Sequence, residues 1–111
     1  MNSTINFEDF TQVDLRVGTI IEVHDFPEAQ NPSYKLTIDF GELGVKKSSA
    51  QITTLYTKDD LLHKQIVAVV NFSAKQIGKF ISECLILGAV NAKDVILLNP
   101  ETKVKNGSVV S

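Results

Sequence analysis

The clearest structural signal in this chain is NFSAKQIGKFISECLILG, at Asn71–Gly88. It joins two apolar runs, Ile66–Val70 and Cys84–Leu87, which are short and rich in branched aliphatic residues. Runs of this kind, bounded by glycine and serine, predict buried strands rather than helices. A polar connector between two rigid strands is where a small β domain usually keeps its binding residues. The same connector also fits a solvated hairpin loop with a few apolar anchors, and the stretch alone leaves both interpretations open.

Length and composition predict a single domain. A chain of 111 residues can bury a core without disulfides or metal ions, and its 43% apolar and 22% charged residues are typical of soluble globular proteins. The first ten residues, MNSTINFEDF, lack the basic and apolar segments of a secretory signal. No apolar run approaches the ~20 residues that span a bilayer. We therefore expect a cytoplasmic protein without membrane insertion.

The charges are distributed unevenly along the chain. Residues 1–45 hold eight acidic and two basic side chains, whereas residues 46–111 hold nine lysines and five acidic side chains. This asymmetry predicts a basic face on an acidic body, as an anion-binding surface requires, although lysines are also common on any surface. The net charge of −2 disfavours a high-affinity duplex binder, because such binding needs many clustered cations.

The first half of the chain predicts a short helix and three strands. Asn6 caps a helix over FEDFTQV, Phe7–Val13, whose first turn is acidic. From Leu15 the side chains alternate with a period of two, which predicts a strand to Val23. Ile21 is expected on the same face of this strand as Leu15 and Val23. Gly18 inside this strand predicts a bulge or a sharp bend. The next two strands are expected after a proline-containing loop and a glycine-bounded turn, at Tyr34–Phe40 and Val45–Ser49.

The second half predicts a helix and two further strands. Ala50–Lys64 has apolar residues at roughly helical spacing, broken near Thr57–Asp60, and is expected to form a short helix and a turn. The remaining strands are expected at Ile66–Phe72, Cys84–Val90 and, as a short addition, Val95–Leu98. Five strands, a bent first strand and a helix between the third and the fourth predict an all-β OB-fold barrel, a class that commonly binds oligonucleotides.

Three segments add a family resemblance: LRVGTIIEV (Leu15–Val23), YKLTIDFGELGVKKSSAQIT (Tyr34–Thr53) and Asn71–Gly88. Together they resemble the tRNA-binding domain family over almost the whole chain, from about Phe7 to Val110. That family includes stand-alone structure-specific tRNA-binding proteins, the appended domain of methionyl- and phenylalanyl-tRNA synthetases, and short bacterial members with a suggested chaperone-like role. The resemblance implies an OB-fold homodimer that binds tRNA.

The family's motif carries over unevenly. Asn71 and Ser82 match its N-x₁₀-S block, and Lys75 stands at a position that is usually basic. Ala74 replaces the family's proline, and Gln76 occupies a place that is often basic. The loop therefore carries fewer cations than in typical relatives.

Lysines attract phosphate, and hydroxyls add short directional contacts. Two segments that carry both kinds of side chain, Lys46–Ser49 and Lys75–Ser82, are therefore suited to nucleic-acid binding. We expect the binding residues to be Lys46, Lys47, Ser48, Ser49, Asn71, Lys75, Lys79, Phe80 and Ser82. Phe80 could stack on an unpaired base or anchor its loop, and Ser82 could meet a ligand or close a turn. We expect the four lysines to converge on one side of the barrel.

An enzyme is not expected. His24 and His63 lie on separate predicted elements without a matching carboxylate motif, and Cys84 sits inside an apolar run as a buried, unreactive thiol. The sequence has no glycine-rich phosphate loop, no G-x-S-x-G and no Cys/His ligand spacing. We expect no catalytic residue, metal or cofactor.

Two functions from different classes remain. One is a tRNA-binding module that acts in trans as a homodimer. The other is a chaperone or export factor that binds unfolded or export-destined polypeptides in an apolar groove of the dimer. The apolar elements that the barrel leaves over, the Phe7/Phe10 face and the tail around Val95–Leu98 and Val104–Val110, favour the dimer in either case.

Overall fold

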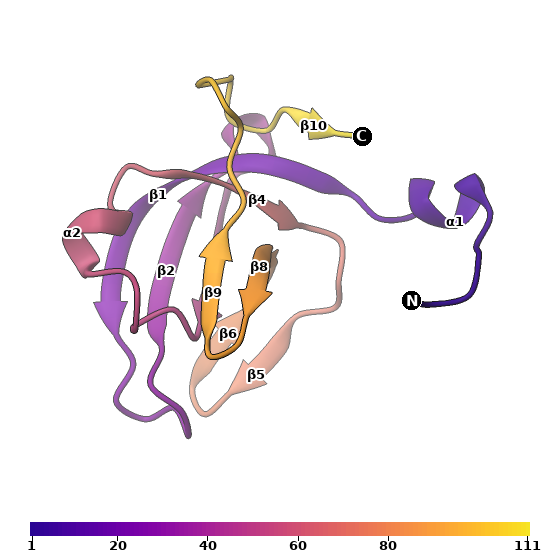
Figure 1. Ribbon diagram of the computed structural model, residues 1–111. Helices are drawn as coiled ribbons and strands as arrows, with labels where there is room; N and C mark the ends of the chain where they lie inside the picture. Colours follow the sequence, from indigo (N-terminus) through magenta and orange to yellow (C-terminus); the bar gives the residue numbers. More distant parts are fainter.

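The computed structural model describes residues 1–111 and confirms an all-β fold built on one curved antiparallel sheet (Figure 1). The strands along the sheet are, in order, β3 (Val45–Ala50), β2 (Tyr34–Asp39), β1 (Leu15–Asp25), β4 (Gln65–Val69) and β7 (Leu85–Ile86). A further strand, β10 (Val109–Val110), pairs with the beginning of β1. β1 pairs with β4 in its first half and with β2 in its second, which curves the sheet into the expected OB-like barrel.

Several short helices and hairpins lie outside the main sheet. The helical ones are α1 (Phe7–Thr11), the 3₁₀ turn η1 (Gly41–Leu43) and α2 (Lys58–Leu61). The others form two hairpins, β5 (Lys75–Ile77) with β6 (Phe80–Ser82), and β8 (Gly88–Asn91) with β9 (Asp94–Leu97). None of the helices has the length and apolar character needed to cross a membrane.

The core lies inside the barrel. In β2 the buried residues alternate with half-exposed ones, as the sequence period predicts, so that Leu36 and Ile38 are fully buried. Ile20 of β1 and Ile66 of β4 meet them there, and Leu61 of α2 belongs to the same cluster. Burial of this cluster is the main stabilising term of the domain.

The expected face of β1 is wrong in its second half. Ile20 is fully buried and Ile21 is exposed, because the register with β2 shifts between Ile20 and Glu22. The bulge returns Val23 to the core side. On its other edge, β1 keeps the register of its pairing with β4 one residue further: the N–H of Ile20 donates to the carbonyl of Lys64 at 2.9 Å, just after α2.

Gly18 is therefore not the bulge, and its role is close packing. A Cβ at Gly18 would lie 2.6 Å from Cγ2 of Ile38 and 2.7 Å from the ring of Phe40. The glycine lets β1 pass over two fully buried side chains.

The helix between β3 and β4 lies later than its apolar spacing suggests. α2 occupies Lys58–Leu61, where the sequence pattern was expected to break. A capping box decides the position: Thr57 Oγ1 accepts from the N–H of Asp60 at 3.1 Å, and the Asp60 carboxylate accepts from the N–H of Thr57 at 2.9 Å. These backbone and side-chain bonds to Thr57 lower the pKa of Asp60.

The stretch 71–88 is a hairpin rather than a plain loop. β5 and β6 pair across it, and the expected fifth strand, Cys84–Val90, is divided into β7 and β8. β4 ends at Val69, before the expected Phe72, although the N–H of Val70 still donates to the carbonyl of Asp14.

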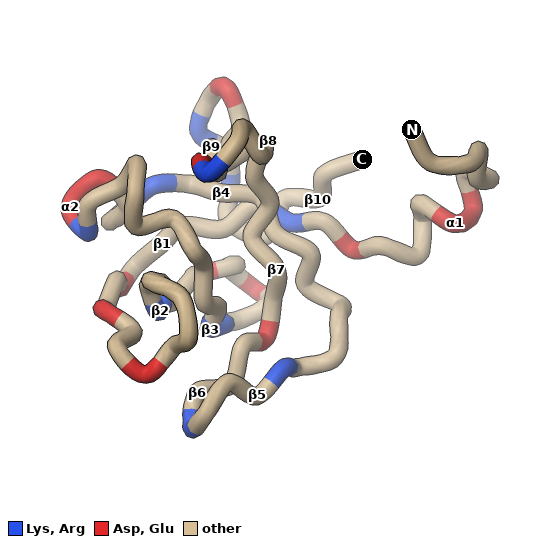
Figure 2. The backbone as a smooth tube through the Cα atoms, turned by 60° about the horizontal axis from the view of Figure 1, so that its bottom comes forward, with Lys and Arg blue, Asp and Glu red and all other residues tan.

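The two chain ends lie on the same side of the molecule. Figures 1 and 2 show α1 standing clear of the barrel, with the C-terminus close to it in both views. α1 is shorter than the expected Phe7–Val13, and none of its residues is buried.

Candidate nucleic-acid interface

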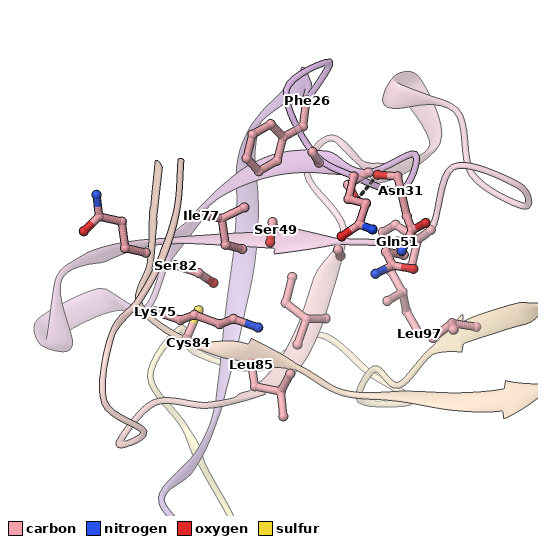
Figure 3. A pocket seen from close by; sticks show the side chains of 18 residues that line it. Phe26, Asn31, Ser49, Gln51, Lys75, Ile77, Ser82, Cys84, Leu85 and Leu97 are labelled. Carbon is pink, nitrogen blue, oxygen red and sulfur yellow. Dashed lines mark hydrogen bonds between the residues drawn. The ribbon is translucent and has the colours of Figure 1, made fainter. Parts of the chain in front are cut away.

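A groove of about 690 Å³ lies where the barrel sheet comes round on itself. Its walls come from the loop after β1, the end of β3, the hairpin β5–β6, β7 and β9 (Figure 3). In an OB-fold, the loop between the first two strands and the loop before the last strand flank the usual binding face. The groove therefore occupies the place where this fold keeps its ligands.

Three of the nine predicted site residues meet in this groove: Ser49, Lys75 and Ser82. Figure 3 shows the Lys75 side chain reaching across the groove, with Ser49 on one side and Leu85 on the other. Lys75 is the one charged residue among the 18 that line it, and no carboxylate faces the groove. The local field thus favours an anion.

The hairpin positions Lys75 and Ser82 together. They are direct cross-strand partners of β5 and β6, so both side chains emerge on the same face. Gly78, with φ of +62°, takes the first turn position between Ile77 and Phe80, where a two-residue turn requires a left-handed residue. Gln76, on the opposite face from Lys75, donates its amide to the carbonyl of Gly78 at 2.9 Å and stiffens the turn.

Ser48 does not reach the surface. Its side chain is 1% exposed, and its hydroxyl donates to the carbonyl of Cys84 at 2.8 Å. Strand alternation turns it inward together with the core residues of β2, opposite Leu36. Ser48 therefore closes the barrel, with its hydroxyl turned away from the surface.

Phe80 packs against the domain. Its ring lies 5.3 Å from that of Phe26, tilted by 59°, and the Lys35 ammonium sits 5.5 Å from the centroid of Phe26. The contact joins the tip of the hairpin to the loop after β1, the two walls of the groove. Of the two roles expected for Phe80, this geometry fits the anchor.

Asn71 lies outside the groove and clamps the N-terminal segment. Its Oδ1 accepts from the N–H of Asp14 at 2.9 Å, and its Nδ2 donates to the carbonyl of Gln12 at 2.7 Å. These bonds fix the link between α1 and β1 against the end of β4.

The other predicted lysines do not line the groove. Lys79 occupies the hairpin turn, and Lys47 is exposed on β3 beside Glu83, whose N–H donates to the Lys47 carbonyl at 2.7 Å. Lys46 is half-buried, on the same face of β3 as Ser48. Figure 2 shows basic residues on β5, on β6 and beside β3, and acidic ones on α1 and α2.

Cys84 is a buried thiol on the floor of the groove. Its residue is 6% exposed, and burial raises the pKa of the thiol to about 11. The Sγ atom lies 3.9 Å from the carbonyl oxygen of Lys47. Such a thiol is a poor nucleophile at neutral pH.

The family model described as "Putative tRNA binding domain" matches residues 15–109. This chain belongs to the tRNA-binding domain family. The match runs from the first residue of β1 into β10, so it includes every wall of the groove.

Members of the tRNA-binding domain family match the chain both in sequence and in structure. The methionine–tRNA ligase of Thermococcus onnurineus is 36% identical over 94% of this chain. The chain spans only 14% of that ligase, and a similar share of the other curated relatives. The crystal structure of chaperone CsaA from Bacillus anthracis is 52% identical, with a TM-score of 0.94 over 98% of this chain and 100% of that one. CsaA from Picrophilus torridus is 50% identical, with a TM-score of 0.91 over 97% and 100%. These findings confirm the resemblance that the sequence motifs predict, both to the appended synthetase domain and to the short chaperone-like members.

Most of the groove residues escaped the sequence-based prediction, among them two amides at one end. Asn31 and Gln51 face Lys75 from the far end of the groove (Figure 3). The loop that holds Asn31 was interpreted only as a connection between strands, although its place after the first strand of an OB-fold was a usable signal. No spacing marks Gln51, which follows β3 directly.

Proposed function

We propose that this protein binds tRNA in trans, as a homodimer in the cytoplasm, through the groove and the lysines around it. The observation that carries the proposal is the convergence of Ser49, Lys75 and Ser82 in a groove without carboxylates. A cation beside hydroxyl donors is what a phosphate-sugar backbone needs. Membership of the tRNA-binding domain family supports the same ligand.

The small number of cations limits the electrostatic, salt-dependent part of the affinity for tRNA. Lys46, Lys47, Lys75 and Lys79 offer at most about four phosphate contacts, so the logarithm of affinity should fall with the logarithm of salt with a slope of about −3 to −4. Shape and hydroxyl contacts must supply the remaining binding energy. No reaction is part of the proposal, because the family is defined by tRNA binding and the matched ligases extend far beyond this chain.

The homodimer rests on the exposed apolar residues at the chain ends. Ile5, Phe7 and Val109 are 66%, 77% and 64% exposed, and the two ends lie on the same side of the molecule (Figures 1 and 2). A two-fold partner covering α1 and β10 would remove this surface from water. Analytical ultracentrifugation at micromolar concentration should show a dimer, and a monomer would remove this part of the proposal.

A second candidate function is binding of unfolded or export-destined polypeptides. It is favoured by the aliphatic side of the groove, which includes Ile52, Leu85 and Leu97, and by the strong likeness to the two CsaA chaperones. Apolar side chains of an extended polypeptide would bury themselves there.

Salt separates the two candidates. Filter binding of total tRNA between about 50 and 300 mM salt should show the steep loss expected for phosphate contacts, whereas binding of an apolar polypeptide should hardly change. Failure to retain tRNA at the lowest salt concentration, together with salt-insensitive retention of an unfolded polypeptide, would replace the first candidate by the second.

A further inference from the structure

One end of the groove offers an open edge of backbone. β3 pairs with β2 alone, and Lys47 uses its N–H and its carbonyl for bonds to Glu83 on the other side. Successive residues of an antiparallel strand alternate in the direction of their backbone groups. Ser49, two residues further on, therefore turns its N–H and carbonyl to the same side, into the groove that it lines, and its carbonyl also accepts a long bond of 3.4 Å from the Ser48 hydroxyl.

Primary amides gather beside this edge. Asn31 and Gln51 lie at the same end of the groove, and each amide presents a donor and an acceptor together (Figure 3). Opposite them, the Lys75 ammonium points toward the middle of the groove. The groove thus combines paired donors and acceptors at one end, one cation at the other, and the aliphatic side chain of Leu85 between them.

We infer that this groove takes an unpaired nucleotide, which makes it the part of the interface that reads single-stranded RNA. The base would lie over Leu85 and present its hydrogen-bonding edge to Ser49 and Gln51, and its phosphate would meet Lys75. The inference rests on the proposed function, because it specifies which feature of a tRNA enters the groove.

Paired RNA does not fit this chemistry. A base inside a helix already uses its Watson–Crick edge, so it has nothing to offer the amides, whereas an unpaired base can be splayed out and read on that edge. Lys47 and Lys79, outside the groove, would then contact the phosphates of the double-helical arms of tRNA, and such contacts carry no sequence information.

An added peptide strand fits less well. Strand addition needs a row of free backbone groups at alternate residues. Here Lys47 is already bonded to Glu83, and β3 ends at Ala50, so the open edge is one residue long. The single cation and the absence of carboxylates further favour an anionic ligand.

Recognition should rest on hydrogen bonds rather than on stacking. Phe26 is 5% exposed, and the half-buried Phe80 packs against it outside the groove, so no open aromatic ring lines the groove. Aromatic platforms bind all bases alike, whereas amide and backbone contacts discriminate between them. We therefore expect one base to bind more tightly than the others.

The test uses ¹⁵N-labelled protein and four probes: hexaribonucleotides of A, of U and of C, and a blunt RNA duplex of ten base pairs. At least one hexanucleotide should shift the signals of the Ser49 backbone amide and the Gln51 side-chain amide and compete with tRNA. The duplex should leave both signals in place. Gln51→Glu keeps the shape of the exposed side chain and puts a carboxylate into the groove, so it should weaken hexanucleotide binding about ten-fold or more. Asn91→Asp, the same change of charge on exposed β8, is the control and should change it less than about two-fold.

The results distinguish a failure of the unpaired-nucleotide inference from a failure of tRNA binding itself. If tRNA binds but no hexanucleotide shifts the Ser49 and Gln51 signals, or the duplex shifts them equally, the groove does not take an unpaired nucleotide. The proposed function then still stands. If tRNA itself does not bind, the proposed function fails. If only an apolar peptide shifts these signals, the groove is a polypeptide site, and the inference is overturned.

Discussion

The hydroxyl of Ser48 donates a hydrogen bond to the carbonyl oxygen of Cys84 at 2.8 Å, across the line where β3 meets the segment after β6. Beside it, the N–H of Lys47 donates to the Glu83 carboxylate at 3.0 Å. These contacts join two segments of the chain that share no ladder of backbone bonds. They close the barrel next to the groove.

Replacing Ser48 by alanine should therefore reduce stability without reducing RNA binding. The change leaves the Cys84 carbonyl unpaired in a buried place, which costs on the order of 1 to 3 kcal/mol. Urea unfolding measures this loss. The matched control is Ser49→Ala, the same deletion at the half-buried neighbour, with an expected change within about 0.5 kcal/mol. Equal stability of the two variants would show that the Ser48 bond does not close the barrel.

Asn71→Ala should loosen the N-terminal segment. The variant loses the bonds to Gln12 and Asp14 that hold α1 to the end of β4, at a cost of about 1 to 2 kcal/mol. Hydrogen exchange at the Asp14 amide should accelerate, and any dimer that uses α1 should weaken. Asn91→Ala, at an exposed position on β8, serves as the comparison. Unchanged exchange at Asp14 would argue against the clamp.

Gly18→Ala should destabilise the domain by about 1 to 3 kcal/mol, because the new methyl group would overlap Ile38 and Phe40 in a filled core. Thermal unfolding measures the change. Adding Phe40→Leu removes part of the overlapping ring and should recover some of the loss. A single variant as stable as the parent would mean that β1 can move away from β2 at little cost.

The Cys84 thiol predicts a fall in stability at alkaline pH. Burial raises its pKa from 9.0 to about 11, so between these values the unfolded chain releases the proton while the folded protein keeps it. The unfolded state then binds fewer protons, and the free energy of unfolding decreases as pH rises. The contribution is complete below pH 9. Urea unfolding between pH 8 and 11, compared with Cys84→Ala, should show the steeper decline in the parent.

The fold could be predicted from the sequence because the patterns that indicate it are local. The alternation of Tyr34, Leu36 and Ile38 can be read in any window, and so can the glycine-bounded turn before β3. α2 escaped the prediction because its position depends on the capping box of Thr57 and Asp60, while the apolar residues before it, of which Ile52 is buried and Leu55 is exposed, are not helical. The bulge after Ile20 escaped because it is a shift in the register between β1 and β2, which no local pattern contains.

The site was predictable in part, for a similar reason. Lys75 and Ser82 could be paired from the hairpin-like stretch that holds them. Ser48 looks the same as Ser49 in the sequence, and only strand alternation and the contact with Cys84 separate a buried bond from an open edge. Asn71 matches a family motif, yet its role depends on the folded position of Gln12 and Asp14.

The most direct test of the interface is the salt dependence of tRNA binding by Lys75→Ala/Lys79→Ala. The double variant should bind tRNA more weakly, and its salt slope should be shallower by up to about two units, one for each lost phosphate contact. Its thermal stability should hardly move, because exposed lysines contribute little. Lys93→Ala/Lys103→Ala removes the same charge from two exposed positions outside the groove and should keep the parent's slope. If the Lys75/Lys79 variant binds tRNA as tightly as the parent with the same slope, the proposed interface is wrong.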